Sequence, residues 1–154
     1  MGELPDTSTD LPNGRENDSP PGTGEGARTV ETVLVVEDTV ELADGIRMSL
    51  ERMNLRVFHA THGHIALDLL REIHPDLVML DLALPDTTGW KLLEVMREQQ
   101  RGEKCPVILV ITAYGDPANR LMGRLQGIHD YLIKPLTPAE IENAVAQVLN
   151  LRRT

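Results

Sequence analysis

The segment from Val78 to Pro85, Val-Met-Leu-Asp-Leu-Ala-Leu-Pro, is a short apolar run interrupted by a single carboxylate, Asp81. A run that starts with a β-branched residue and stops at a proline suits a strand buried on both faces, whereas a helix needs about 10 residues or more. Asp81 then lies at the carboxyl end of that strand. Because burying an unpaired carboxylate is very costly, we expect Asp81 to have a cationic partner or a chemical role.

Strand-length apolar segments recur along the chain, and segments with apolar residues at helical spacing lie between them. The strand candidates begin near Val33, Leu55, Leu77, Val107 and Tyr131. Strands and helices that alternate in units of roughly 30 residues indicate βαβ units. Right-handed crossovers join such strands into an open parallel sheet with helices on both faces. The pattern therefore predicts a doubly wound α/β domain.

Two of the predicted helices begin with clear signals. Thr137, Pro138 and Glu140 supply an N-cap, a first-position proline and a capping-box glutamate for the last helix. Asp116 caps the helix that runs to Gln126, but Gly123 inside that helix costs about 1 kcal/mol relative to alanine. We expect the helix containing Gly123 to be the most loosely held.

The first residues differ from the rest of the chain. Residues 1 to about 28 contain four prolines and five glycines among acidic and hydroxyl residues, and they contain no aromatic residue. Such a segment cannot bury enough apolar surface to fold. We predict a disordered tail over residues 1–30 and one folded domain over residues 31–154.

The charge balance restricts the class of partner. The chain has 15 basic and 24 acidic residues and a formal net charge of −9, so a nucleic-acid-binding surface gains no support. No apolar stretch approaches the roughly 18 residues of a membrane-spanning helix, and the start of the chain has no signal-peptide pattern. We expect a cytoplasmic protein that binds other proteins, with no membrane insertion and no direct contact with nucleic acid.

Polar residues follow four of the predicted strands. Glu37 and Asp38 come after the first strand, Asp81 ends the third, Thr112 ends the fourth and Lys134 follows the fifth. The carboxyl ends of parallel strands meet at one edge, which is where ligands bind such sheets. Two carboxylates about 4 Å apart repel by about 4 kcal/mol at an effective dielectric constant of 20. Three of them need a cation, and hard oxygen ligands in an open site favour Mg²⁺.

Taken alone, some of these residues have simpler interpretations. Asp38 could cap the helix that follows it, with Glu41 completing a capping box, and only the convergence of charges favours a ligand role. Tyr131 could be an ordinary strand aromatic. Cys105 is expected to be a small buried apolar residue. Three histidines lack the helical spacing and the cysteine partner typical of a zinc site: His59, His62 and His64.

Five sequence segments, in this order and each at a strand end, resemble the receiver domain of two-component response regulators. They are Val33–Asp38, Asp76–Pro85, Gly89, Thr112–Ala113 and Asp130–Pro135. The resemblance covers about residues 32 to 150, which makes residues 31–154 the receiver domain. It implies a flavodoxin-like, doubly wound sheet of five parallel strands in the order 2-1-3-4-5.

The resemblance implies a phosphorylation site. Asp81 would accept a phosphoryl group from a histidine kinase or a histidine phosphotransfer protein. Glu37, Asp38, Asp81 and the backbone carbonyl of Ala83 would hold Mg²⁺. The protein would not be an enzyme in the ordinary sense, although it would take part in its own phosphorylation and in slow dephosphorylation.

The resemblance also implies a switch. Thr112 would contact the phosphoryl group, Lys134 would pair with it, and Tyr131 would change rotamer. The surface formed by the fourth helix, the fifth strand and the fifth helix would then bind a downstream protein. A phosphorylation-dependent homodimer is left open. Because the chain ends directly after the last helix, a single-domain regulator is expected.

Some positions depart from the family pattern. Thr88 stands where the family more often has aspartate, and Ala83 stands where a larger or polar residue is common. Ala83 offers no hydrogen bond to an attacking water, and Tyr114 is bulky enough to shield the site. We therefore expect slow loss of the phosphoryl group.

Three other classes of protein compete with this interpretation. A phosphohydrolase of the haloacid-dehalogenase type also uses a strand-end aspartate, but its second aspartate is replaced here by Ala83. A flavin-binding module needs a phosphate loop where this chain has Glu37 and Asp38, which would repel phosphate. A receiver-shaped adaptor that does not need phosphorylation would have no reason to keep the full acidic set with Thr112 and Lys134.

Overall fold

The structure is a computed structural model, and it describes residues 30–113, 115 and 117–153. The predicted tail lies outside the described residues except for residue 30, so its boundary stays a prediction. The described part forms five strands: β1 (Thr32–Val36), β2 (Arg56–Ala60), β3 (Leu77–Asp81), β4 (Val107–Thr112) and β5 (Asp130–Ile133). It forms five helices: α2 (Val40–Arg52), α3 (Gly63–Ile73), α4 (Gly89–Gln99), α5 (Pro117–Gln126) and α6 (Pro138–Arg153).

The strands build one parallel sheet in the order β2-β1-β3-β4-β5, as predicted. The pairing register brings the strand ends level, because Val36 of β1 lies opposite Leu80 of β3 and Asp81 of β3 lies opposite Ile111 of β4. Residues that follow these strands therefore emerge at one edge of the sheet.

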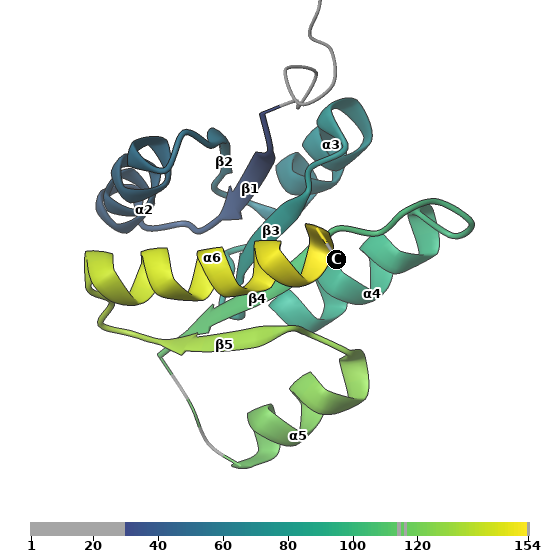
Figure 1. The fold of residues 1–154 in the computed structure, drawn as a ribbon. Helices are drawn as coiled ribbons and strands as arrows, with labels where there is room; N and C mark the ends of the chain where they lie inside the picture. The colour runs from purple at the N-terminus through teal and green to yellow at the C-terminus, as the bar shows by residue number, and fades with distance from the viewer. Residues whose placement is uncertain (1–29, 114, 116, 154) are drawn as a thin grey trace, which may run out of the picture.

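Helices cover both faces of the sheet (Figure 1). Successive residues of β1 point to opposite faces: Val33 and Val35 join the core beneath α2 and α6, whereas Leu34 and Val36 join the core beneath α3 and α4. Every residue of β3 and β4 is buried, because both strands lie in the middle of the sheet. This explains why their sequences are continuous apolar runs.

The last helix begins as the sequence predicts. The Thr137 hydroxyl oxygen accepts a hydrogen bond from the Glu140 backbone N–H (3.1 Å), and the Glu140 carboxylate accepts one from the Thr137 backbone N–H (3.0 Å). The two bonds form a complete capping box.

Helix α5 buries few of its residues against the rest of the domain. It buries one residue, Gly123, whereas α2 buries four. A Cβ atom at position 123 would lie 2.9 Å from the Cδ1 atom of Ile128, so this glycine lets the helix approach its neighbours closely. The sequence indicated only its cost in helix propensity. Asp116, the predicted cap, lies outside the described residues.

The prediction for Cys105 is wrong, because its side chain is exposed. Cys105 belongs to the connection between α4 and β4, and the buried strand begins two residues later, at Val107. Among the helices that the structure describes, none is long and apolar enough to cross a membrane.

Candidate functional site

The carboxyl ends of four strands bring polar side chains together. Glu37 follows β1, Asp81 ends β3, Thr112 ends β4 and Lys134 follows β5. Glu37, Asp81 and Thr112 are buried, with at most 2% of each residue exposed. Buried carboxylates at a sheet edge require compensation, and Lys134 supplies part of it.

Lys134 bridges the two buried carboxylates. Its Nζ atom lies 3.1 Å from Oε1 of Glu37 and 3.1 Å from Oδ2 of Asp81. Its backbone N–H donates to the carbonyl of Thr112 (2.8 Å), and the Lys134–Pro135 peptide bond is cis. The two ion pairs show that the ammonium group points inward from the end of β5.

The two carboxylates that Lys134 contacts belong to a cluster of three. Ligand oxygens of Glu37, Asp38 and Asp81 lie within 4.8 Å of one another, and Asp38 alone of the three is exposed. The alternative role of Asp38 as the cap of the following helix is wrong, because Thr39 occupies the N-cap position of α2. Instead, the Glu37 carboxylate accepts a hydrogen bond from the Thr39 backbone N–H (3.1 Å).

The electrostatics of the cluster favour a second cation. Burial raises the pKa of Glu37 to about 7, and the charge of Asp81 adds to this effect, while the Thr39 N–H and Lys134 oppose it. Burial alone would lower the pKa of Lys134, but hydrogen bonds and charges from Glu37 and Asp81 together raise it. One ammonium group therefore does not neutralise the cluster.

The loop after Asp81 holds that carboxylate in place. Its Oδ1 atom accepts a hydrogen bond from the Ala83 backbone N–H (3.1 Å). Gly89, at the start of α4, packs against the same backbone, and a Cβ atom there would lie 2.7 Å from the Asp81 carbonyl oxygen and 2.8 Å from Cα of Leu82. Only glycine fits this approach, which gives a structural reason for Gly89 in the sequence pattern.

The two predicted switch residues lie on adjacent strands. Thr112 lies opposite Ile133, and Tyr131 lies opposite Val110, two residues back along β4. Tyr131 is half-buried and packs against the core beneath α3 and α4. The Arg120 guanidinium lies 5.6 Å from the centroid of the Tyr131 ring, so α5 covers this side chain.

Sequence reasoning missed one residue beside the site. The Nε2 atom of His59, in β2, lies 2.7 Å from the Glu37 carbonyl oxygen. No local pattern indicates this contact, because it depends on the pairing of β1 with β2. The three histidines do not form one group: the ring centroids of His62 and His64 lie 5.6 Å apart, but His59 contacts the Glu37 carbonyl instead. In the part of the chain that the structure describes, the carboxylates alone form a candidate metal cluster.

Comparisons with known proteins identify the class of domain. The family described as the response regulator receiver domain matches residues 33–146. The chain belongs to this family of two-component signalling domains.

Two relatives illustrate the range of proteins that the chain matches. It is 39% identical over 123 residues to the transcriptional regulatory protein ResD of Bacillus subtilis, covering 79% of this chain and 50% of that protein. It is 36% identical over 115 residues to an uncharacterized 14.6 kDa protein of Leptolyngbya boryana, covering 75% of this chain and 87% of that protein. The chain spans about half the length of the first curated relatives that it matches.

A solved structure shares the fold. The CheY-like response regulator receiver domain from Methanospirillum hungatei superposes with a TM-score of 0.73 over 81% of this chain and 98% of that one, at 22% identity. Receiver domains are signalling domains that bind Mg²⁺ at an acidic pocket, and Glu37, Asp38 and Asp81 form an acidic cluster of this kind.

Proposed function

We propose that this chain is a phosphorylation-dependent switch that accepts a phosphoryl group on Asp81, with Mg²⁺ bound beside it. The observation that supports this proposal most is the arrangement around Lys134. Its ammonium group contacts two buried carboxylates, and a third, Asp38, lies at the open side of the same cluster. A solely structural ion pair needs one carboxylate per ammonium group.

The residues present fit Mg²⁺. Glu37, Asp38 and Asp81 offer hard oxygen ligands, and the carbonyl of Ala83, two residues past Asp81, would complete the protein's share. A divalent cation would stabilise the ionised form of Glu37, whose pKa is raised to about 7 by burial and, to a smaller extent, by the charge of Asp81. When bound, Mg²⁺ would neutralise charge on the phosphoryl oxygens during transfer.

The chain's own residues then have distinct roles. A carboxylate oxygen of Asp81 would attack the phosphorus of a phosphohistidine, so that the new P–O bond forms as the P–N bond breaks and the electron pair returns to the imidazole. Lys134 would pair with the charged phosphoryl oxygens, and the Thr112 hydroxyl would donate a hydrogen bond to one of them. The donor would be a histidine kinase or a histidine phosphotransfer protein.

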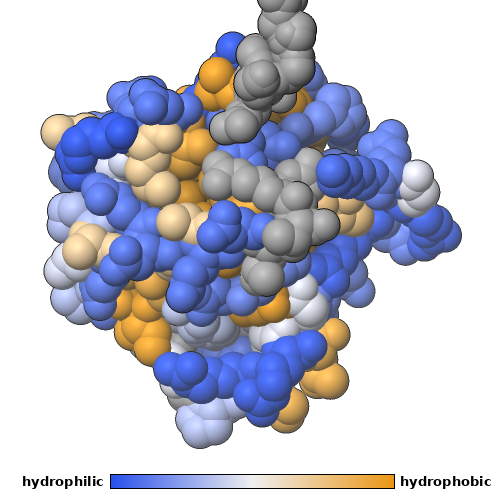
Figure 2. All heavy atoms as spheres, in the orientation of Figure 1, coloured by the Kyte–Doolittle hydropathy of each residue, from blue (hydrophilic) through white to orange (hydrophobic). Residues whose placement is uncertain are grey.

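The output surface would be formed by α5, β5 and α6, which are the fourth helix, fifth strand and fifth helix of the sequence prediction. Described residues of α5 include Arg120 and Arg124 but no acidic residue, and Leu121 and Leu125 are at least half exposed. Apolar and hydrophilic side chains lie side by side over α5 at the lower edge of Figure 2. Because α5 buries so little, a phosphoryl group that draws Thr112 and Tyr131 inward could shift this helix at low cost.

Intact-mass measurement after incubation with acetyl phosphate and Mg²⁺ tests the proposal. Wild-type protein is expected to gain one hydroxylamine-labile phosphoryl group, and Asp81→Asn is expected to gain none. Asp68→Asn, which changes an exposed aspartate on α3, is the matched control and should be modified like wild type. Equal modification of Asp81→Asn would refute the acceptor assignment, and a wild-type protein that binds Mg²⁺ but gains no phosphoryl group would favour the adaptor alternative.

Hydrogen exchange with and without phosphorylation tests the output surface. Exchange is expected to change in α5 and β5 and to stay the same in α3. If α5 and β5 showed no change in the phosphorylated protein, the output surface would lie elsewhere.

A further inference from the structure

The loop between β3 and α4 is a miniature hairpin. Ala83 pairs with Thr88 as an antiparallel bridge, and the Gly89 backbone N–H donates to the carbonyl of Leu82 (2.8 Å). Asp86 lies at the tip of this hairpin, beside Pro85 and about midway between Ala83 and Thr88. The base of the hairpin starts at the proposed phosphoacceptor.

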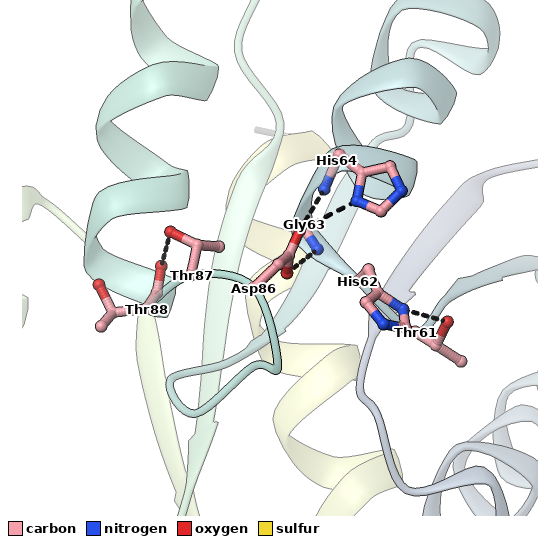
Figure 3. Close-up of polar contacts among 7 residues, drawn as sticks. All are labelled: Thr61, His62, Gly63, His64, Asp86, Thr87 and Thr88. Carbon is pink, nitrogen blue, oxygen red and sulfur yellow. Dashed lines mark hydrogen bonds and ion pairs between the residues drawn. The ribbon is translucent and has the colours of Figure 1, made fainter.

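The tip is docked on another element of the fold. Asp86 Oδ1 accepts a hydrogen bond from the Gly63 backbone N–H (2.8 Å), and Oδ2 accepts one from the His64 backbone N–H (3.1 Å) (Figure 3). Oδ2 also lies 3.0 Å from Nδ1 of the His64 ring. The side chain of His62, which precedes α3, makes no cap hydrogen bond, so Asp86 caps this helix from a distant loop.

Two further observations show that the contact is tight. A Cβ atom at position 63 would lie 2.6 Å from Cγ2 of Thr87 and 3.4 Å from Oδ1 of Asp86, so glycine leaves the space that the hairpin tip occupies. The His64 side chain and the Gly63 N–H hold the pKa of Asp86 well below its usual range. The carboxylate is therefore charged at neutral pH and suited to a helix N-terminus.

The hairpin is consequently held at both ends. At its base, the Ala83 N–H donates to Asp81 Oδ1 (3.1 Å). At its tip, Asp86 is tied to α3. Ala83, whose carbonyl is the proposed backbone ligand for Mg²⁺, makes the attachment at the base, and Asp86 makes the attachment at the tip three residues further on.

We propose that Asp86 is a positioning residue for the metal site: by tying the hairpin tip to the N-terminus of α3, it holds the Ala83 carbonyl ready for Mg²⁺. This inference rests on the proposed function. A loop that is already ordered loses little conformational entropy when the cation binds, whereas a released loop must be ordered at that moment. Residues behind a metal's direct ligands commonly act in this way.

Isothermal titration of Mg²⁺ into the full chain tests the role of Asp86. Asp86→Ala is expected to bind Mg²⁺ about tenfold more weakly than wild type. Asp68→Ala is the matched control, because it removes one carboxylate from α3 itself, where Asp68 makes only an exposed pair with Arg71. The affinity of this control for Mg²⁺ should stay within about twofold of wild type, since exposed charges interact weakly with a distant site.

The outcomes separate the two proposals. If wild-type protein bound no Mg²⁺, the proposed function itself would fail. If wild type bound Mg²⁺ and Asp86→Ala bound it equally well while its melting temperature fell, Asp86 would be only a helix cap.

A second measurement needs no variant. Coupling between two sites is reciprocal. If docking of the hairpin on α3 raises the affinity for Mg²⁺, then bound Mg²⁺ must also stabilise the docked hairpin. We expect the Gly63 and His64 amides of wild type to exchange more slowly with solvent when Mg²⁺ is saturating. The Glu140 amide, which is held by the capping box of α6, should not respond. Unchanged exchange at Gly63 and His64 would overturn the inference even if Asp86→Ala failed to fold.

Discussion

The Nζ atom of Lys134 lies 3.1 Å from the Oδ2 atom of Asp81, although 53 positions separate the two residues in the chain. The parallel sheet brings them together, because β3 and β5 end at the same edge with β4 between them. Glu37 completes the contact from β1. The charges of the three residues interact directly, so replacing one residue should change the electrostatic energy of the other two.

Removing the ammonium group should destabilise the metal-free protein. Lys134→Ala leaves Glu37 and Asp81 buried without their shared cation, and we expect a loss of about 2 kcal/mol or more in the free energy of unfolding at pH 8. Saturating Mg²⁺ should restore much of the lost free energy of unfolding. Denaturant unfolding with EDTA or with Mg²⁺ measures both effects. Lys91→Ala removes an exposed lysine that pairs with Glu94 and should cost less than about 0.5 kcal/mol. Equal losses in both variants would contradict the bridging role.

Glu37 should make the metal-free protein less stable as the pH rises. Its folded-state pKa of about 7 lies above the ordinary value of 4.5, so between these values the folded state binds the proton more tightly than the unfolded state. Its stabilising contribution is present below pH 4.5 and is lost as the pH passes 7, with an upper bound of about 3 kcal/mol. Urea unfolding in EDTA from pH 5 to pH 8 measures how the free energy of unfolding changes with pH. Glu37→Gln should make this pH dependence flatter. Parallel slopes for the two proteins would argue against a raised pKa.

Asp38 should matter for the metal and little for the fold. Asp38→Ala removes an exposed carboxylate from a repelling cluster, so we expect Mg²⁺ to bind at least about tenfold more weakly while the metal-free protein keeps or gains stability. Calorimetric titration and thermal unfolding check the two parts. Asp44→Ala, an exposed change on α2, serves as the control. An unchanged Mg²⁺ titration would remove Asp38 from the site.

Two glycines in helices should respond in opposite ways to alanine. Gly89→Ala places a Cβ atom 2.7 Å from the Asp81 carbonyl oxygen, and because backbone atoms cannot move aside easily we expect a loss of about 2 kcal/mol in the free energy of unfolding. At Gly45, inside α2, an added Cβ atom would meet nothing within 4 Å, so Gly45→Ala should gain up to about 1 kcal/mol from helix propensity. Denaturant titration of both variants measures the two changes in the free energy of unfolding. An unchanged free energy for Gly89→Ala would show that the loop after Asp81 can move aside.

The lifetime of the phosphoryl group should depend on position 83. Ala83 is exposed beside Asp81 and carries no group that could orient a water molecule. Ala83→Asn supplies such a group, and we expect the half-life of the phosphorylated protein to shorten severalfold. A time course of intact mass after removal of acetyl phosphate measures it. Ala83→Val, which adds bulk without a hydrogen bond, should not shorten the half-life. Tyr114, the second residue of the sequence-based expectation, lies outside the described residues.

The sequence by itself determined the fold class and the edge at which the site forms. Continuous apolar runs in β1, β3 and β4 are local signals of strands covered on both faces. Once the strands are parallel, the residues after them must share an edge. Asp81, Glu37 and Lys134 could therefore be assigned to one site from their order alone.

Only the tertiary structure decided which side chains touch. Asp38 lies in the carboxylate cluster while Thr39 takes the N-cap position of α2, Cys105 is exposed, and Gly123 is a packing position. The docking of Asp86 on Gly63 joins a loop tip to a helix that precedes it by 23 residues. Contacts of this kind depend on the path of the chain in space and leave no period in the sequence. The physical reason is that the periodicity of strands and helices follows from burial against the sheet. A hydrogen bond between a loop tip and a helix end requires only that the two lie close together in space.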